Sequence, residues 1–485
     1  MRVLATLCLV IPWVCLASSA TKGLVNTNVI RTVDLQGLPF VREQVGVVIQ
    51  NDHDSKVFKT YTISIDQDKA PNLSQLQVFE RKSGHSLDLT KETAQTYRAV
   101  LRRGLLPGEK LSLNIDFVFV SLVQPRPQAV KQSDDQSWLW ADNSLVPSVY
   151  PTRKQKTVVR TKGDVRVFTD GGARDGKQSV VFGPFTGEQG GGRVEVGFKD
   201  NSEQMEALTH RREYFVSHWA DDLNVLEHYA LRSLGPESTF DKVDQMVSKY
   251  MHRRDNLVKT LLVKVPAEAR EMYFVDEIGN VSTSAVSKQR RAKGEDAFRV
   301  MQLRPRYPIS GGWNYTWWHG YSLPLSRYLK VSPQSRHHLR LPFIGSMAAC
   351  ASLEGELTLA MANAQNTAVR QYELRVTLPE GARDIAVELP VAGRARLEST
   401  KYYFDSIGGR TAVVITHENV APELYARHIL VSYSYSPWAL WMKPMVVGSA
   451  FFVLFVLASI ASRMEYGLAP GGRSLGAKSK AAKKD

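Results

Sequence analysis

An uncharged apolar run near the C-terminus constrains this chain more than any other feature. Met445–Ser462 is 18 successive residues without Asp, Glu, Lys or Arg. At ~1.5 Å per residue, a helix of this length covers about 27 Å, close to the hydrocarbon core of a thin bilayer. Trp438 and Trp441 precede the run and Tyr466 follows it, as interfacial aromatic side chains do. We expect a juxtamembrane segment and transmembrane helix over 438–462; the alternative is a buried core helix.

The two ends of the chain predict its topology. Residues 1–20 are typical of a signal peptide, because Arg2 precedes an apolar stretch and small side chains lead up to Ala20. The alternative is a retained anchor, although the apolar stretch is short for a span. Residues 463–485 hold six Lys or Arg against two acidic residues, and such tails stay cytosolic. We expect the bulk of the chain to be lumenal, with a short basic cytosolic tail.

Charge and cysteine content exclude other classes of protein. Part of the formal charge of +14 lies in the tail, so the excess indicates membrane topology and not a nucleic-acid partner. Cys8 and Cys15 lie in the expected signal peptide, which leaves Cys350 alone in the mature chain. No internal disulfide can therefore form. We expect Cys350 to be a buried thiol, with intermolecular pairing as the alternative.

The segment between the two ends alternates apolar and polar residues with a period of two. This pattern indicates half-buried antiparallel strands, and Gly-rich turn signals separate them. The fold class is therefore mainly β, with two tandem lumenal β-sandwich-like domains at 21–230 and 231–437 and one C-terminal transmembrane helix. Two such domains would be a divergent duplication at most. A helical period is confined to 240–251. The clearest alternating stretches are 61–65, 111–119, 194–198, 372–378 and 431–435.

A search for catalytic chemistry gives no candidates. The sequence has no HExxH zinc motif and no GxSxG nucleophile elbow, and the mature chain cannot hold a CxxC motif. We therefore assign no catalytic, cofactor or metal residues. Basic clusters at 288–293 and 336–340 could bind acidic groups, and solvated loops are the alternative.

Glycosylation and contact sites are the remaining candidates. Asn72, Asn280 and Asn314 begin Asn-X-Ser/Thr sequons. Residues 311–321 carry five aromatic side chains, which suit an interface, sugar stacking or a core-anchoring loop. The candidate interface residues, for which a role in the fold is the alternative, are Asp276, Glu277, Trp313, Trp317, Trp318 and Tyr321.

Several segments together resemble the ribophorin I family, the large single-span accessory subunits of the oligosaccharyltransferase complex. The most specific is YFVDEIGNVSTS at 273–284. The likeness runs from about residue 24 to the apolar run. Further matching segments are LRPRYPISGGW at 303–313, GYSLP at 320–324, VTLPEGA at 376–382, YFDSIG at 403–408, LVN at 24–26, RTVDL at 31–35, YPT at 150–152 and SHW at 217–219.

The resemblance implies a non-catalytic subunit of the endoplasmic reticulum membrane that supports assembly of the complex. It would present acceptor polypeptide for N-linked glycosylation at Asn-X-Ser/Thr. The partners implied are the catalytic and accessory subunits and the nascent polypeptide. The family's lumenal part resembles the non-catalytic sandwich of M1 aminopeptidases. Asn280 falls at the sequon of the most specific motif and is the preferred glycan site.

One departure concerns the ribosome. In animal members a cytosolic helical bundle contacts the ribosome. The 23-residue tail of this chain is too short to form such a bundle, which argues against direct ribosome contact. The alternatives to the family's function are a type I receptor or adhesion protein and a degenerate peptidase-like lumenal protein.

Overall fold

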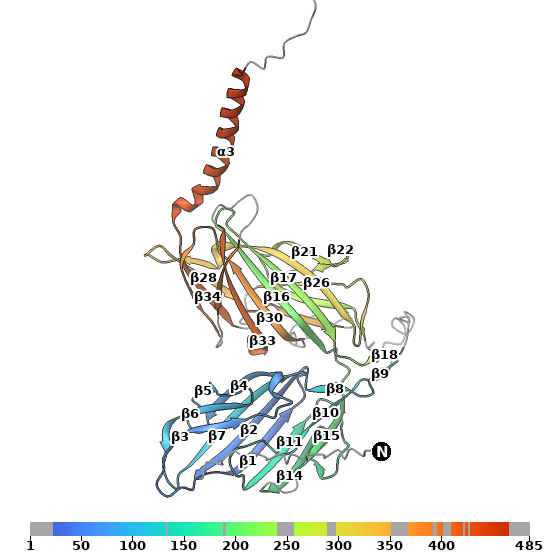
Figure 1. Ribbon diagram of the computed structural model, residues 1–485. Coiled ribbons are helices and arrows are strands. Elements are labelled where there is room, and N and C mark those ends of the chain that lie inside the picture. Colours follow the sequence, from blue (N-terminus) through green and yellow to red (C-terminus); the bar gives the residue numbers. More distant parts are fainter. Residues whose placement is uncertain are drawn as a thin grey trace, which may run out of the picture.

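A computed structural model describes two β-rich bodies and one C-terminal helix (Figure 1). It describes residues 23–131, 134–187, 191–239, 257–288, 297–350, 367–390, 395–400, 409–420, 422–424 and 427–464. The expected signal peptide, the helical period at 240–251 and nearly all of the basic tail lie outside these residues. The mainly β fold class with one C-terminal apolar helix is confirmed.

The first body packs a seven-stranded sheet, ordered β13-β14-β11-β1-β2-β7-β4, against two smaller sheets around one apolar core. The smaller sheets are β12-β15-β10-β8 and β3-β6-β5. The elements are β1 (Leu24–Asp34), β2 (Phe40–Asn51), β3 (Phe58–Ser64), η1 (Ala70–Asn72), β4 (Leu73–Glu80), β5 (Asp88–Lys91), β6 (Thr96–Leu105), β7 (Lys110–Val120), β8 (Val123–Pro125), β10 (Ser137–Asn143), β11 (Lys154–Arg160), β12 (Val165–Val167), β13 (Gly172–Arg174), β14 (Ser179–Thr186) and β15 (Arg193–Lys199).

The second body is built in the same way. An eight-stranded sheet, ordered β22-β21-β26-β17-β16-β30-β33-β32, shares a core with the sheets β23-β24-β20-β29 and β27-β28-β34-β31. Its elements are β16 (Met205–Ser217), β17 (Asp222–Ser233), β20 (Thr260–Pro266), β21 (Arg270–Asp276), β22 (Gly279–Asn280), β23 (Ala285–Val286), β24 (Phe298–Leu303), β26 (Asn314–Pro324), η2 (Leu325–Arg327), β27 (Leu329–Val331), β28 (Arg336–Pro342), β29 (Ser346–Cys350), β30 (Thr367–Thr377), β31 (Arg383–Glu388), β32 (Ala395–Thr400), β33 (Arg410–Val420), η3 (Pro422–Leu424) and β34 (His428–Ser434).

Short strand pairs lie beside the large sheets. Along the connection between the bodies, β9 (Ala129–Val130) pairs in parallel with β18 (Glu237–Ser238). In the second body, β19 (Leu257–Val258) pairs with β25 (Ile309–Ser310).

The two bodies repeat one strand topology. In the first, β1 pairs antiparallel with β2 and parallel with β11; in the second, β16 pairs antiparallel with β17 and parallel with β30. The flanking strands β7, β4, β14 and β13 correspond to β26, β21, β33 and β32. Of the smaller sheets, β8-β10-β15-β12 matches β27-β28-β34-β31, and β3-β6-β5 matches β20-β24-β23. A β-bulge follows Asn26 in β1 and Ala207 in β16. The chain therefore contains an internal structural repeat.

Sheet pairing groups residues 205–233 with the second half of the chain, although the expected division at about 230 placed them in the first. Both β16 and β17 are central strands of the eight-stranded sheet. Periodicity shows that a segment is a strand but not which sheet it joins.

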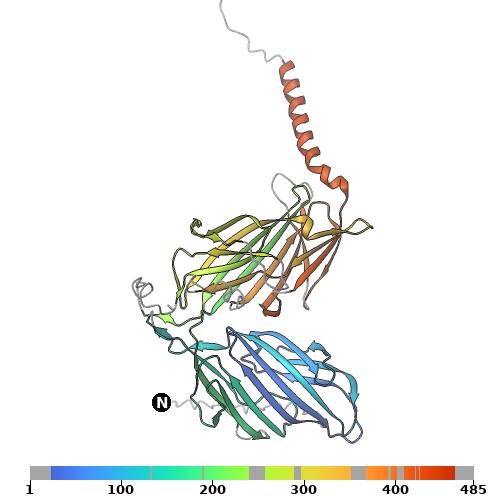
Figure 2. The same cartoon turned by 180° about the vertical axis from the view of Figure 1, so that it is seen from behind.

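The C-terminal helix α3 spans Pro437–Arg463 and extends away from the second body, on the side opposite the first (Figures 1 and 2). It is long and apolar enough to cross a membrane. Phe451 is 68% exposed and Phe455 71% exposed. Because no described part of the protein covers these large side chains, lipid is the environment that suits them.

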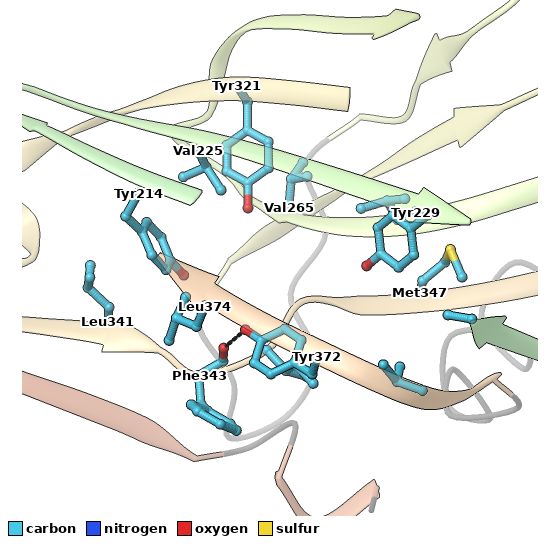
Figure 3. Packing of buried hydrophobic residues seen from close by; sticks show 14 of the residues in the cluster. Tyr214, Val225, Tyr229, Val265, Tyr321, Leu341, Phe343, Met347, Tyr372 and Leu374 are labelled. Carbon is cyan, nitrogen blue, oxygen red and sulfur yellow. Dashed lines mark hydrogen bonds between the residues drawn. The ribbon is translucent and has the colours of Figure 1, made fainter. Parts of the chain in front are cut away.

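The core of the second body lies between the eight-stranded sheet and the two smaller sheets. Figure 3 shows Tyr214, Tyr229 and Tyr321 with their hydroxyl groups turned into this space, and the Tyr372 hydroxyl donating to the carbonyl oxygen of Phe343. The core therefore contains polar groups that need partners.

Candidate interface site on the second body

The β21–β22 hairpin carries the sequence motif DEIGN, and Asp276 fixes its turn. Asp276 is 3% exposed, and its Oδ1 accepts the backbone N–H groups of Ile278 and Gly279 at 3.0 and 3.1 Å. Its Oδ2 accepts Nε of Arg306 at 2.6 Å. Burial alone would raise the pKa of Asp276, but these hydrogen bonds and the Arg306 charge lower it overall. Asp276 therefore holds the hairpin, and the exposed Glu277 and Ile278 form its tip.

The aromatic-rich segment forms β26, and successive side chains along this strand point to opposite faces of the sheet. The predicted interface residues on β26 therefore divide into an inward set and an outward set. Trp317 and Tyr321 are 0% and 3% exposed, so they belong to the core and not to the surface. The Trp317 ring stacks on Tyr229 and Tyr315 at centroid distances of 4.8 and 5.6 Å. Trp318 points to the opposite face, where it stacks on His228 at 6.0 Å.

Exposed apolar side chains gather along this edge of the eight-stranded sheet. Ile278 is 80% exposed, Trp313 48% and Tyr307 41%, and the rings of Tyr307 and Trp313 meet at 5.8 Å. Large exposed apolar groups in contact with one another mark interaction surfaces. We define the apolar edge as the exposed Tyr273, Ile278, Tyr307 and Trp313 together with the half-buried Trp318.

The three sequons occupy different environments. Asn280 and Asn314 are exposed, and both border the apolar edge. Asn72 is half-buried, and its Oδ1 accepts Nη1 of Arg370 at 2.6 Å between the two bodies. Geometry thus favours glycans at Asn280 and Asn314.

A buried polar network in the second body was not expected from the sequence. His210, Arg212 and Glu227 are 1%, 3% and 1% exposed. Glu227 accepts the Tyr229 hydroxyl at 2.9 Å and lies 3.1 Å from His210 Nε2. Charged residues at inward positions of alternating strands were the signal that could have revealed it.

Charge states in this network follow from burial and from the single carboxylate. Burial would raise the pKa of Glu227, but the nearby Arg212 and His210 hold it well below its ordinary range. Burial lowers the pKa of His210 and lowers that of His319 to about 4. At neutral pH the network therefore holds one cation, Arg212, and one anion, Glu227.

The first body contains a denser buried cluster of charges. Arg31 donates to Glu43 at 3.0 and 2.8 Å and also pairs with Asp142. Lys69 Nζ lies 2.8 Å from Asp142 and 3.1 Å from Glu43. Two cations thus face two carboxylates, as buried charges require.

The other sequence candidates are placed as follows. The basic cluster at 336–340 lies on β28. In the other basic cluster, 288–293, all residues after Lys288 lie outside the described residues. In the part of the chain that the structure describes, no three His, Cys, Asp or Glu side chains gather as a metal site would need.

Comparison with curated proteins gives relatives over most of the chain. Subunit 1B of the dolichyl-diphosphooligosaccharide–protein glycosyltransferase of Arabidopsis thaliana is 30% identical over 372 residues, which is 75% of this chain and 74% of the relative. Subunit 1 from Caenorhabditis elegans is 26% identical over 415 residues, which is 83% of this chain and 66% of the relative. The alignment thus spans slightly less than two thirds of the nematode protein.

Solved structures give a weaker likeness. An M1 zinc metallopeptidase from Deinococcus radiodurans is 14% identical, and the match covers 41% of this chain and 49% of that chain with a TM-score of 0.24. Leukotriene A4 hydrolase from Saccharomyces cerevisiae is 10% identical, with coverage of 38% and 30% and a TM-score of 0.24. At these scores the likeness carries no argument, and the resemblance to the peptidase sandwich stays a prediction.

Two repeated β bodies, followed among the described residues by one helix long and apolar enough to cross a membrane, define a class: mainly β proteins with a C-terminal candidate membrane span. The family model described as Ribophorin I matches residues 24–462. The chain belongs to the Ribophorin I family.

Proposed function

We propose that this protein is a non-catalytic subunit of the oligosaccharyltransferase complex in the endoplasmic reticulum membrane. In this proposal both bodies are lumenal, the tail is cytosolic, and the protein supports complex assembly and presents acceptor polypeptide. Membership of the Ribophorin I family supports the assignment to the complex. The apolar edge is the surface that we propose contacts other subunits of the complex.

The apolar edge has the chemistry of a protein–protein contact. Ile278 projects from a hairpin turn that the Asp276–Arg306 pair holds in place. Tyr307 follows Arg306, which also donates to the hairpin carbonyl oxygens of Gly279 and Asn280, and the Tyr307 ring meets Trp313. Large aromatic side chains dominate the binding energy of most interfaces. A preorganised apolar surface loses little conformational entropy when a partner covers it.

The start of α3 supports placing the second body at the membrane surface. Trp438 and Trp441 are 76% and 62% exposed at the first turns of the helix. Trp219, at the tip of the β16–β17 hairpin, is 62% exposed and lies in the same small hollow as Ala439 and Lys443. Tryptophan favours the interfacial layer of a bilayer, so these side chains fit headgroups.

Co-purification of the full-length chain tests the contact. In the double variant Ile278→Asp, Trp313→Ala, we expect recovery of the multispan catalytic subunit to fall about tenfold, because each change removes a large apolar contact. The matched control is Leu397→Asp, since Leu397 is 53% exposed on β32 at the opposite edge of the same sheet. The control variant should recover the complex as the unaltered chain does.

Two outcomes would count against the proposal. Equal recovery from the double variant and the control would remove the apolar edge as an assembly surface. An intact complex that no longer glycosylates a reporter sequon would assign the edge to the acceptor polypeptide and not to a neighbouring subunit.

A further inference from the structure

The second body contains a cleft between its two smaller sheets. The cleft has a volume of about 670 Å³, within the range of small-molecule sites. One wall comes from β20 and the loop before β24, and the other from β27, β28 and β34. The floor is formed by Arg212 of β16 and Tyr321 of β26, on the eight-stranded sheet. We call it the basic cleft, because of the side chains that line it.

Cations dominate the lining of the basic cleft. Its lysines and arginines are Arg212, Lys264, Arg327, Lys330 and Arg340, and His338 and His428 lie among them. Glu268 is the one carboxylate among the described lining residues, and it pairs with Arg327 at 2.7 Å. Arg212 also pairs with Glu227 beneath the cleft, at 3.2 Å, whereas Lys330 and Arg340 form no ion pair with any described residue. These two cations give the mouth of the cleft an attraction for anions.

A comparison of Arg212 with Arg31, its counterpart in the internal repeat, shows which partners Arg212 lacks. The central strands β1 and β16 are equivalent in the repeat, and each contains a β-bulge. Arg31 lies four residues after the bulged residue of β1, and Arg212 lies four residues after that of β16. Arg31 is enclosed by Glu43 and Asp142, and its Nη1 donates to the carbonyl oxygen of Asn143 at 2.8 Å. All three guanidinium nitrogens of Arg31 therefore have acceptors.

Arg212 has fewer partners. Its Nη2 donates to the Tyr321 hydroxyl at 3.2 Å, and its Nη1 lies 3.2 Å from Glu227 Oε1 without hydrogen-bond geometry. Its Nε has no acceptor among the described residues, although the side chain is 3% exposed. The counterpart of Asp142 would come from β28, whose sequence RHHLRLP contains no acid. The buried Arg212 guanidinium thus pairs with one carboxylate where Arg31 pairs with two, and it is short of hydrogen-bond acceptors.

Gly345 keeps the floor open. A Cβ at this position would lie 2.7 Å from Glu227 Oε2 and would also meet Nη1 of Arg212. Any side chain here would press on the ion pair and fill the bottom of the cleft. The glycine therefore leaves room for the Arg212–Glu227 ion pair at the bottom of the cleft.

We propose that the basic cleft binds the phosphate or diphosphate group of a water-soluble ligand, with Arg212 at its floor and Lys330 and Arg340 at its mouth. Several guanidinium and ammonium donors around one pocket suit a group that carries two charges and several acceptor oxygens. A lipid phosphate is less suitable, because Leu430 in the wall lies seven residue steps before Pro437 of α3, about 23 Å of extended chain.

Calorimetric titration of the full-length chain in phosphatidylcholine nanodiscs tests the site, with inorganic pyrophosphate and inorganic phosphate as the probes. We expect saturable binding that weakens about tenfold or more in Lys330→Glu, Arg340→Glu, since two attractive charges become repulsive. Arg383→Glu is the matched control, because Arg383 is exposed at the opposite edge of the same small sheet. Its affinity should stay within about twofold of the unaltered chain.

A variant of Arg212, at the floor of the basic cleft, provides a second test. Arg212→Gln should abolish pyrophosphate binding. This variant also leaves Glu227 buried without its cation and can fail to fold. In that case the double variant Lys330→Glu, Arg340→Glu decides the test. The proposal is overturned if pyrophosphate does not bind saturably or if the double variant binds it as the control does. It is also overturned if citrate displaces pyrophosphate at equal concentration, or if only vesicles that contain phosphatidic acid bind.

Discussion

Arg370 of the second body donates a hydrogen bond of 2.6 Å from Nη1 to Oδ1 of Asn72 in the first body. The same guanidinium pairs through Nε with Glu206 and reaches Asn419 Oδ1 at 3.3 Å. Asn419 in turn donates to the carbonyl oxygen of Pro71 at 2.7 Å. One arginine therefore connects both bodies, beside a small apolar cluster of Phe40, Val118, Val120 and Ala368.

Replacing this arginine should loosen the junction. In Arg370→Ala, Glu206 keeps a hydrogen bond from Ser121 but loses its cation, and its side chain is 7% exposed. We expect a loss of about 3 kcal/mol and a fall of several degrees in the unfolding temperature of the full chain. The control is Arg42→Ala, because the Arg42–Glu423 pair also crosses the junction but is 44% and 39% exposed. That pair should contribute under about 1 kcal/mol, and equal effects of the two variants would contradict the assignment.

Glycan occupancy should follow the three environments of the sequons. We expect Asn280 and Asn314 to be occupied in most copies, because both side chains are exposed. Asn72 should be occupied in a small minority, since it is half-buried at the junction and holds Arg370. Glycopeptide mass spectrometry after deglycosylation in heavy-oxygen water measures all three, and comparable occupancy at Asn72 would show that the junction tolerates a glycan.

Period-two alternation predicted the strands, because it is local and each body buries one face of its sheets. The stretch 111–119 lies within β7 and 194–198 within β15. The sequence did not predict that β16 and β17 join the second sheet, because strand pairing joins residues far apart in the chain. The topological repeat was equally hidden, since it rests on pairing order and not on side-chain identity.

The candidate site was predicted only in part, because strands far apart in the chain bring its residues together. Alternation along 314–321 could have assigned Trp317 inward and Trp318 outward, but the sequence could not say which parity faced the core. The basic cluster at 336–340 was visible, and its position beside Arg212 was not, because three different sheets bring those residues together.

The buried charges of the first body should make stability depend on pH. Burial would raise the pKa of Asp142, but Arg31 and Lys69 lower it below its ordinary value of 3.8. A lowered pKa in the folded state means that the contribution of Asp142 to the unfolding free energy is present above about pH 4 and is lost as the pH falls further. Urea unfolding at pH 7, 5 and 3 measures this.

Two variants isolate the contribution of Asp142. Asp142→Asn should cost about 3 kcal/mol at pH 7, and its difference from the unaltered chain should shrink toward pH 3. Asp52→Asn is the control, because Asp52 and Arg153 pair at 2.6 Å with 30% and 58% exposure. Its difference should stay under about 1 kcal/mol at every pH. A constant deficit in Asp142→Asn would mean that lost packing, and not charge, explains the effect.

Adjacent tryptophans on β26 provide a matched test of the inward and outward faces. Trp317 is 0% exposed, stacks on Tyr229 and donates from Nε1 to His319 at 3.3 Å. Trp317→Ala should therefore cost about 3–5 kcal/mol, because it leaves a cavity and removes a donor next to a buried imidazole. Trp318→Ala should cost about 1 kcal/mol, since it removes only the outer stack on His228. Urea unfolding of both variants measures the difference. If the outer variant were the less stable one, the face assignment of the whole strand, and with it the apolar edge, would be wrong.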